Sequence, residues 1–195
     1  MSEMGVQVGV SRIRSGPVTV MGARTAAPGI IVDDAAVRAA LAEVMDPELP
    51  MLSVVDLGII HRVDLGTGAD DSIRVEILPT FVGCPALELI KRSIGERLAV
   101  FGRPVRVETT FEVPWTSERI TEAGREALRG AGIAPPGEDS VAAASGGLID
   151  LEPRVPCPHC GSRRTRLENL FGPTACRTIR FCTDCRQPFE AIKPV

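Results

Sequence analysis

The chain has 195 residues, of which 44% are hydrophobic, 24% charged and 4% aromatic. This apolar content suffices for a packed core and excludes a wholly disordered chain, and the length corresponds to one or two domains. No apolar run approaches the roughly 18 residues of a membrane span, so we expect no membrane contact. The N-terminus lacks the hydrophobic segment of a secretory signal, which predicts a cytoplasmic protein with reduced cysteines.

The net charge of −3 is unevenly distributed. Residues 34–135 carry 11 basic and 16 acidic side chains, whereas residues 154–195 carry eight basic and three acidic ones, a net +5. A basic tail invites a nucleic-acid interpretation. Four thiolates around one Zn²⁺ would lower that charge to about +3, which is weak evidence for nucleic acid.

The first ordered domain is predicted to begin after residue 33. Residues 1–33 mix Gly, Ser and Arg with isolated Val, which is typical of a flexible leader. Asp33 and Asp34 are good N-caps for a helix whose apolar residues recur at helical spacing until Pro47 stops it. Alternation in residues 59–65 and 73–77, around a Gly-rich turn, then predicts a β-hairpin.

The second half of this domain repeats the alternation of helix and strand. We expect a helix over residues 86–101 ending at Gly102, a strand over 105–110 and a more polar helix over 117–130. The order α-β-β-α-β-α over residues 34–136 predicts a small α+β sandwich. Residues 137–153 form a Gly/Ala/Ser/acid linker, and residues 154–195 a separate cysteine module.

Two Cys-x-x-Cys pairs, separated by 21 residues, dominate the C-terminal module. Each tight turn can aim two sulfurs at one ion, so the pairs predict a four-thiolate zinc ribbon with a structural Zn²⁺; an Fe–S or redox-active site is the alternative. So short a module cannot bury a large core, and we expect the ion to supply most of its folding energy. Cys176 is interpreted as a small buried hydrophobe or an auxiliary ligand. The pairs are Cys157 with Cys160 and Cys182 with Cys185.

Cys84 follows the hairpin and directly precedes Pro85. Since Pro favours the first helical position, Cys84 is predicted to be the N-cap, where backbone N–H groups and the helix dipole favour a thiolate able to bind iron or attack sulfur. A buried cap without chemistry is the alternative. Thr80 could hydrogen-bond across the same turn.

Three acids lie in the loops after the first helix: Asp46, Glu48 and Asp56. Loop acids are commonly solvated caps, but carboxylates are also hard metal ligands and hydrogen-bond acceptors. The residues alone leave both interpretations open.

Longer motifs carry a resemblance to known families. Residues 46–60 (DPELPMLSVVDLGII) and 78–85 (LPTFVGCP) resemble the metal-sulfur cluster biosynthetic domain of the SufT type. With residues 114–116, 120–124, 132–136 and 171–176 and the ribbon, the chain from 34 to 195 is similar to the PaaD-type accessory proteins of the bacterial phenylacetyl-CoA epoxidase system.

The resemblance implies a function in phenylacetate degradation. Such proteins are thought to help mature the metal centres of the epoxidase, delivering iron or an Fe–S cluster, and not to catalyse epoxidation. Their partners are epoxidase components or the Fe–S reductase. The cysteine of the family's Thr-x-x-x-Cys-Pro turn corresponds to Cys84, with Thr80. The family's Asp-Pro-Glu turn corresponds to Asp46 and Glu48, and its Asp-Leu-Gly motif to Asp56. These five residues are the implied candidates for metal transfer. Besides the structural Zn²⁺, a transient iron or Fe–S cluster is therefore implied.

Other functions receive less support from the residues. A zinc-ribbon module that binds nucleic acid or protein without transferring metal is the alternative, although an acidic main domain and few aromatic residues argue against nucleic acid. Catalysis by this chain alone is not expected, because it lacks the Glu-x-x-His pair of di-iron bundles and a dinucleotide glycine fingerprint. A homo-oligomer is compatible with the sequence, which does not decide the oligomeric state.

Overall fold

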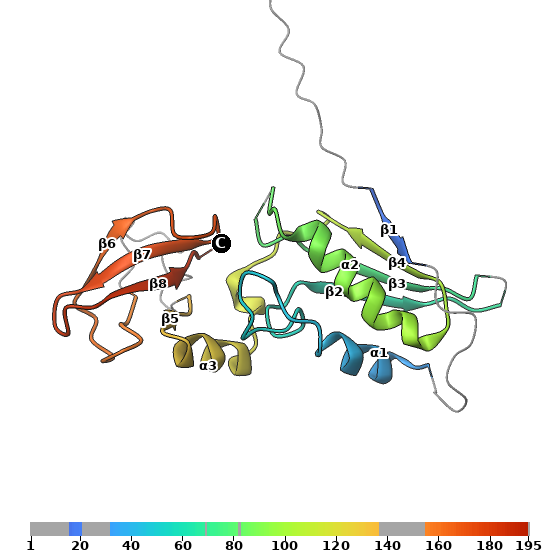
Figure 1. The fold of residues 1–195 in the computed structure, drawn as a ribbon, viewed down its shortest axis with the longest axis horizontal. Helices are drawn as coiled ribbons and strands as arrows, with labels where there is room; N and C mark the ends of the chain where they lie inside the picture. Colours follow the sequence, from blue (N-terminus) through green and yellow to red (C-terminus); the bar gives the residue numbers. More distant parts are fainter. Residues whose placement is uncertain (1–15, 21–31, 69, 82, 137–154, 195) are drawn as a thin grey trace, which may run out of the picture.

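The structure is a computed structural model that describes residues 16–20, 32–68, 70–81, 83–136 and 155–194. In these residues the chain forms two four-stranded sheets, which lie in two parts of the molecule with helix α3 beside the second sheet (Figure 1). The mixed α/β architecture confirms the predicted α+β class. Among the described residues, no helix has both the length and the apolar character needed to span a membrane.

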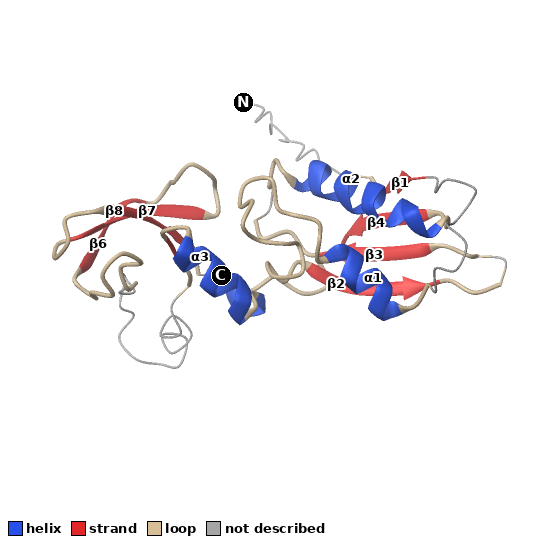
Figure 2. Cartoon of the chain, turned by 60° about the horizontal axis from the view of Figure 1, so that its bottom comes forward, coloured by secondary structure: helices blue, strands red, loops and turns tan. Residues whose placement is uncertain are grey.

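The first sheet has the strand order β1-β4-β3-β2. Strands β2 (Ile60–Leu65) and β3 (Ile73–Ile77) form the predicted antiparallel hairpin, and β4 (Val105–Thr109) pairs with β3 in parallel. Helices α1 (Asp34–Leu41) and α2 (Leu87–Leu98) lie next to each other along this sheet (Figure 2), and the short helix η1 (Ala99–Phe101) continues α2. The α2 helix is the crossover that a parallel β3–β4 pair needs.

Alternating apolar side chains of the first sheet make the main core. In β3 the inward positions are fully buried, as are the matching positions of β4, and the apolar face of α2 covers them. Each fully buried Val, Leu or Ile side chain contributes about 1.5–3 kcal/mol relative to exposure. The core therefore fixes the ends of β3 and α2, and with them the loop that carries Cys84. These buried residues are Ile73, Val75, Ile77, Val105, Val107, Ile90, Ile94 and Leu98.

Part of the predicted leader is ordered, which corrects that prediction. Strand β1 (Val18–Val20) pairs antiparallel with β4 and completes the edge of the first sheet. The buried ammonium of Lys91 on α2 donates to the Gly16 carbonyl oxygen at 3.0 Å. Two β-branched valines suit an edge strand. Residues 1–15 and 21–31 of the predicted leader lie outside the described residues.

The predicted helix over residues 117–130 is also corrected. The chain forms a short 3-10 helix, η2 (Ser117–Arg119), and then α3 (Glu122–Gly130). Thr121 lies between them with extended backbone, and its hydroxyl oxygen accepts from Gly124 N at 3.0 Å. An N-cap with this geometry starts a new helix, so the two cannot be continuous.

The second sheet joins the ribbon to the preceding domain. Its order is β5-β8-β7-β6, with β5 (Ile133–Ala134), β6 (Thr165–Asn169), β7 (Arg177–Cys182) and β8 (Pro188–Ile192). Residues 133–134, predicted to end the first domain, instead pair in parallel with β8 of the ribbon. The ribbon is therefore anchored to the first domain. The predicted linker over 137–153 lies outside the described residues.

Candidate metal and thiol sites

The four ribbon cysteines converge on one point. The sulfur atoms of Cys157 and Cys185 are 3.7 Å apart, and those of Cys160 and Cys182 are 3.6 Å apart. Zn–S bonds of about 2.3 Å in a tetrahedron place the sulfurs about 3.8 Å apart, so the four thiols fit a tetrahedral ion. Among the described residues, these four side chains form a group whose ligand atoms all lie within 4.8 Å of one another.

Two similar turns position the thiols. The first turn ends at Gly161 with a φ of 72°, and the second ends at Arg186 with a φ of 58°. In the first turn, Gly161 N donates to Cys157 O at 2.8 Å. The left-handed conformation at each turn's end lets the chain reverse directly behind the pair of cysteines. The side chain of Asp184 accepts hydrogen bonds from Ser162 and Arg164 and so links the two turns.

The local backbone favours ionisation at one of these thiols. Hydrogen bonds from the backbone N–H groups of Cys185 and Asp184 lower the pKa of Cys182 to about 7. Desolvation raises the pKa of Cys185 to about 12. Since a metal ligand is a thiolate, binding of an ion by this cluster releases protons, and acid opposes it.

Cys84 lies in the loop between β3 and α2, but it is not the helix cap predicted from the sequence. The N-cap of α2 is Ala86, which makes no side-chain capping bond, and α2 begins at Leu87. Cys84 N donates to Phe81 O at 3.1 Å, and Leu87 N donates to Cys84 O at 3.3 Å. Consecutive turns thus separate Cys84 from the helix, which begins later than expected.

The environment of Cys84 opposes the thiolate. Burial is the main cause that raises the pKa of its thiol, and the negative charges of Glu48, Asp46 and Cys176 add to it. A hydrogen bond from Ala86 N lowers the pKa but does not outweigh them. The predicted preference for the thiolate is therefore wrong in the free protein, because the hydrocarbon and carboxylates around the sulfur outweigh the helix N-terminus.

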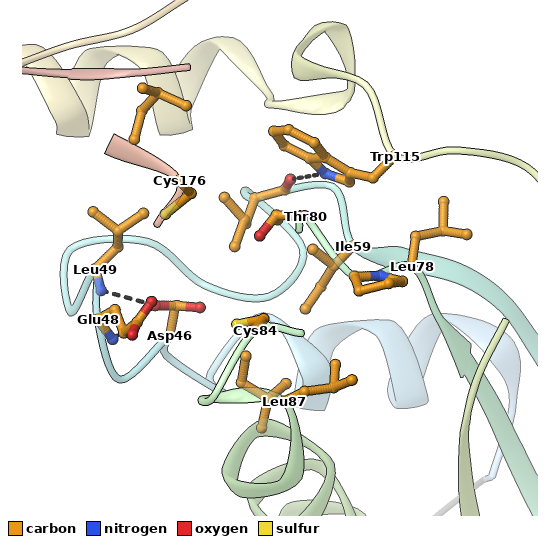
Figure 3. A pocket seen from close by; sticks show the side chains of 14 residues that line it. Asp46, Glu48, Leu49, Ile59, Leu78, Thr80, Cys84, Leu87, Trp115 and Cys176 are labelled. Carbon is orange, nitrogen blue, oxygen red and sulfur yellow. Dashed lines mark hydrogen bonds between the residues drawn. The ribbon is translucent and has the colours of Figure 1, made fainter. Parts of the chain in front are cut away.

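The half-buried Cys84 side chain faces a pocket between the two domains (Figure 3). The lining is mostly apolar, and the indole N–H of Trp115 donates to Leu57 O at 3.0 Å in its wall. The ribbon contributes Cys176 and Ile192. The polar lining residues are Asp46, Glu48, Thr80, Cys84 and Cys176.

Of the acids in the loop after α1, Asp46 and Glu48 reach this pocket. The Asp46 side chain is 6% exposed, and its Oδ1 atom accepts from the backbone N–H groups of Glu48 and Leu49, both at 2.8 Å. The carboxylate thus shapes the Asp-Pro-Glu turn and is held against the pocket. Thr80 also lines it, and no hydrogen bond joins the Thr80 hydroxyl to Cys84 among the described contacts.

Asp56 lies elsewhere and is fully engaged. Its carboxylate accepts from the hydroxyls of Ser53 at 2.6 Å and Thr121 at 2.9 Å, and Asp56 is not among the pocket-lining residues. Thr121 is also the N-cap of α3. Asp56 therefore ties the loop before β2 to α3, and the structure does not bring it together with Cys84.

Cys176 is a pocket residue that the sequence did not place near Cys84. It directly precedes β7, and its backbone carbonyl accepts from Lys193 N at 2.9 Å. The Thr174 hydroxyl contacts its sulfur at 3.2 Å. The sequence offered one signal, a fifth cysteine in a module whose ion needs four.

Comparison with known proteins agrees with this two-part organisation. Residues 34–109 match the family described as iron-sulfur cluster assembly protein, and residues 142–193 match the PaaD zinc β-ribbon domain. The fold and site thus define an iron-sulfur assembly domain joined to a zinc ribbon. A protein of Escherichia coli K12, whose name places it among the subunits of 1,2-phenylacetyl-CoA epoxidase, is 37% identical over 80% of this chain and 89% of its own length. The chain belongs to this PaaD family.

A more distant relative and a solved structure each match about half of this chain. A protein of Mycobacterium tuberculosis named iron-sulfur cluster carrier protein is 36% identical over 50% of this chain, which spans only 24% of that relative. A solved DUF59 domain from Bacillus anthracis has 23% identity and a TM-score of 0.40, covering 49% of this chain and 90% of that one.

Proposed function

We propose that this protein is an accessory factor that delivers iron or an Fe–S cluster to the metal centres of the phenylacetyl-CoA epoxidase system, with Cys84 as the transient ligand. The observation that carries the proposal is the pocket in which Cys84 faces Asp46 and Glu48. The names of the E. coli and mycobacterial relatives support the pathway and the cargo class. The epoxidase components or their Fe–S reductase are the expected clients, in the cytoplasm.

The chemistry of the pocket suits a carrier. A donor must bind metal tightly enough to carry it and loosely enough to release it. One half-buried thiol with a raised pKa meets this need better than a closed cage of four sulfurs, because a proton competes with the metal at that thiol. The four-thiol cluster of the ribbon is assigned the structural Zn²⁺, which holds the ribbon folded.

The ribbon arginines lend little support to the nucleic-acid alternative. Arg164 pairs with Asp184, Arg166 with Glu168 and Arg177 with Glu190. Carboxylate partners reduce the positive charge available for phosphates. A ribbon that binds a protein without transferring metal is separated from the carrier function by the experiment below.

The test is the metal content of the client oxygenase, made in cells that lack the chromosomal copy of this protein. Wild-type protein restores iron in the client, whereas Cys84→Ser leaves it deficient by at least about tenfold. The control is Glu126→Gln, which changes an exposed carboxylate on α3 and should restore iron fully. Unfolding curves verify that Cys84→Ser stays folded. Normal client iron with Cys84→Ser would contradict the proposal.

A further inference from the structure

Two thiols from different domains face the same pocket. Cys84 comes from the loop before α2, and Cys176 comes from the ribbon directly before β7. In Figure 3 the two sulfurs and the Asp46 carboxylate border one space. The four cysteines that fit a structural ion are elsewhere in the ribbon, so neither of these thiols is committed to it.

Only one of the two oxygens of the Asp46 carboxylate is used in the Asp-Pro-Glu turn. Its Oδ1 atom accepts two backbone hydrogen bonds, whereas Oδ2 has no hydrogen-bond partner among the described residues. The side chain is 6% exposed. An ionised carboxylate oxygen that makes no hydrogen bond is available to bind a cation in the pocket.

The ribbon holds Cys176 over the pocket through several contacts. One guanidinium nitrogen of Arg177 donates to the Glu48 carbonyl oxygen at 3.4 Å, and another bonds the Glu190 carboxylate at 2.6 Å. Ile192 of β8 packs into the core of the first domain. The position of the Cys176 sulfur is thus set by docking of the ribbon onto the loop that carries Asp46 and Glu48.

The pocket has room for a single ion. Its volume is about 20 Å³, room for roughly one water-sized body. Two sulfurs and one carboxylate oxygen suit a borderline divalent ion such as Fe²⁺, Co²⁺ or Zn²⁺.

We propose that Cys84 and Cys176 are the two sulfur ligands of a single-ion cargo site, with Asp46 as the oxygen ligand. The inference rests on the proposed function for its purpose, and it adds that the ribbon contributes a ligand to the transfer site. The three ligands are less closely assembled than the four ribbon thiols. A site that must be drawn together on binding holds its ion less tightly, which suits an ion that has to leave.

The site is tested by Co²⁺ titration of the full-length protein with Zn²⁺ in the ribbon, under argon and with a non-thiol reductant. We expect one further Co²⁺ per chain, with a thiolate-to-cobalt charge-transfer band. Cys176→Ser should roughly halve that band and weaken binding at least about tenfold, as should Cys84→Ser. The control is Glu168→Gln, which changes an exposed carboxylate of the ribbon that does not line the pocket and should bind Co²⁺ as wild type does.

The outcomes separate this inference from the proposed function. Unchanged Co²⁺ binding in Cys176→Ser overturns the two-thiol site, and so does the absence of a further ion in the wild type. Neither result decides whether Cys84 is needed for client iron, because that is read from the client. Zinc analysis of each variant verifies that the ribbon cluster keeps its ion.

Discussion

The two cysteine sites differ in how closely their ligands are assembled before an ion arrives. In the ribbon, pairs of sulfurs already lie 3.6 and 3.7 Å apart, held by two turns with matching backbone geometry. In the pocket, Cys84 is half-buried; burial raises the pKa of its thiol, and the nearby carboxylates add to the effect. The ribbon sulfurs are thus held ready for one ion, and under the proposed function the less closely assembled thiol of the pocket is the one that exchanges its ion.

The two sites are nevertheless parts of one assembly. Strand β5 of the first domain extends the ribbon sheet, and Ile192 of the ribbon extends the core of the first domain. Folding of the ribbon around its ion therefore also builds one wall of the pocket. The difference between the two sites can be tested by variants that remove the ion of the ribbon, loosen the contact between the domains, or change acids of the first domain.

The largest effect is expected from Cys182→Ser. The Cys182 side chain is fully buried, and loss of one of four thiolates removes most of the binding free energy of the ion, about 10–16 kcal/mol for structural zinc sites at neutral pH. The ribbon should unfold, with less than one zinc per chain and rapid cleavage of residues 155–194 by a protease. Elemental analysis and limited proteolysis measure both.

Cys176→Ser is the control for that variant. It changes a cysteine of the same module outside the four-thiol cluster, so the zinc content and protease resistance should match wild type. Zinc retained in Cys182→Ser, or lost in Cys176→Ser, would contradict the assignment of the ligands.

Arg177→Ala should loosen the contact between the domains. The Arg177 side chain is 10% exposed and bonds the Glu190 carboxylate and the Glu48 carbonyl oxygen. Removing it leaves a partly buried carboxylate unpaired, and because Glu190 retains some water contact we expect a loss of about 1–3 kcal/mol in the free energy of unfolding. Urea unfolding of the zinc-loaded protein measures it.

The control is Arg129→Ala, which breaks the exposed pair with Glu122 on α3. Such pairs contribute about 0–1 kcal/mol, so this variant should unfold almost as wild type does. Equal losses in the two variants would show that the Arg177 contacts do not hold the ribbon in place.

Asp56→Ala should lower the stability of the protein without affecting the proposed transfer of iron to the client. It removes the acceptor for the hydroxyls of Ser53 and Thr121, and we expect a loss of about 1–3 kcal/mol in the free energy of unfolding, with client iron still restored. Asp46→Ala removes an acceptor as well, but it should also lower client iron. Similar client iron in both variants would contradict the distinction between these acids.

Local patterns predicted those parts of the molecule that depend on neighbours in sequence. Alternation revealed the β2–β3 hairpin, and Asp33 is the N-cap of α1, with Ala36 N donating to its side chain. The spacing of the Cys-x-x-Cys pairs predicted one cluster, and their sulfurs converge. In each case a turn or a helix face is decided within a few residues.

Features that depend on partners far along the chain were missed. Strand β1 pairs with the edge of β4, and β5 pairs with β8. These strands have only three and two residues, which is too short for an alternating pattern to reveal them in the sequence. Cys176 reaches the pocket only because the ribbon docks there. The thiolate at Cys84 was predicted from the helix terminus alone. The apolar residues and acids that raise its pKa are brought to it by the tertiary fold, so the local sequence does not reveal them.

The smallest expected effect is a shift in the reactivity of Cys84 with pH. Burial raises the pKa of this thiol, with Glu48 adding to it, so the thiolate fraction at pH 8 is below that of a free cysteine peptide with a pKa of about 8.5. Alkylation by iodoacetamide, followed by peptide mass spectrometry, should rise with a midpoint above the peptide's. In Glu48→Gln the midpoint should move down, because the carboxylate charge no longer opposes ionisation. Steric shielding would slow alkylation at every pH and leave the midpoint unchanged, and a midpoint at or below the peptide's would contradict the raised pKa.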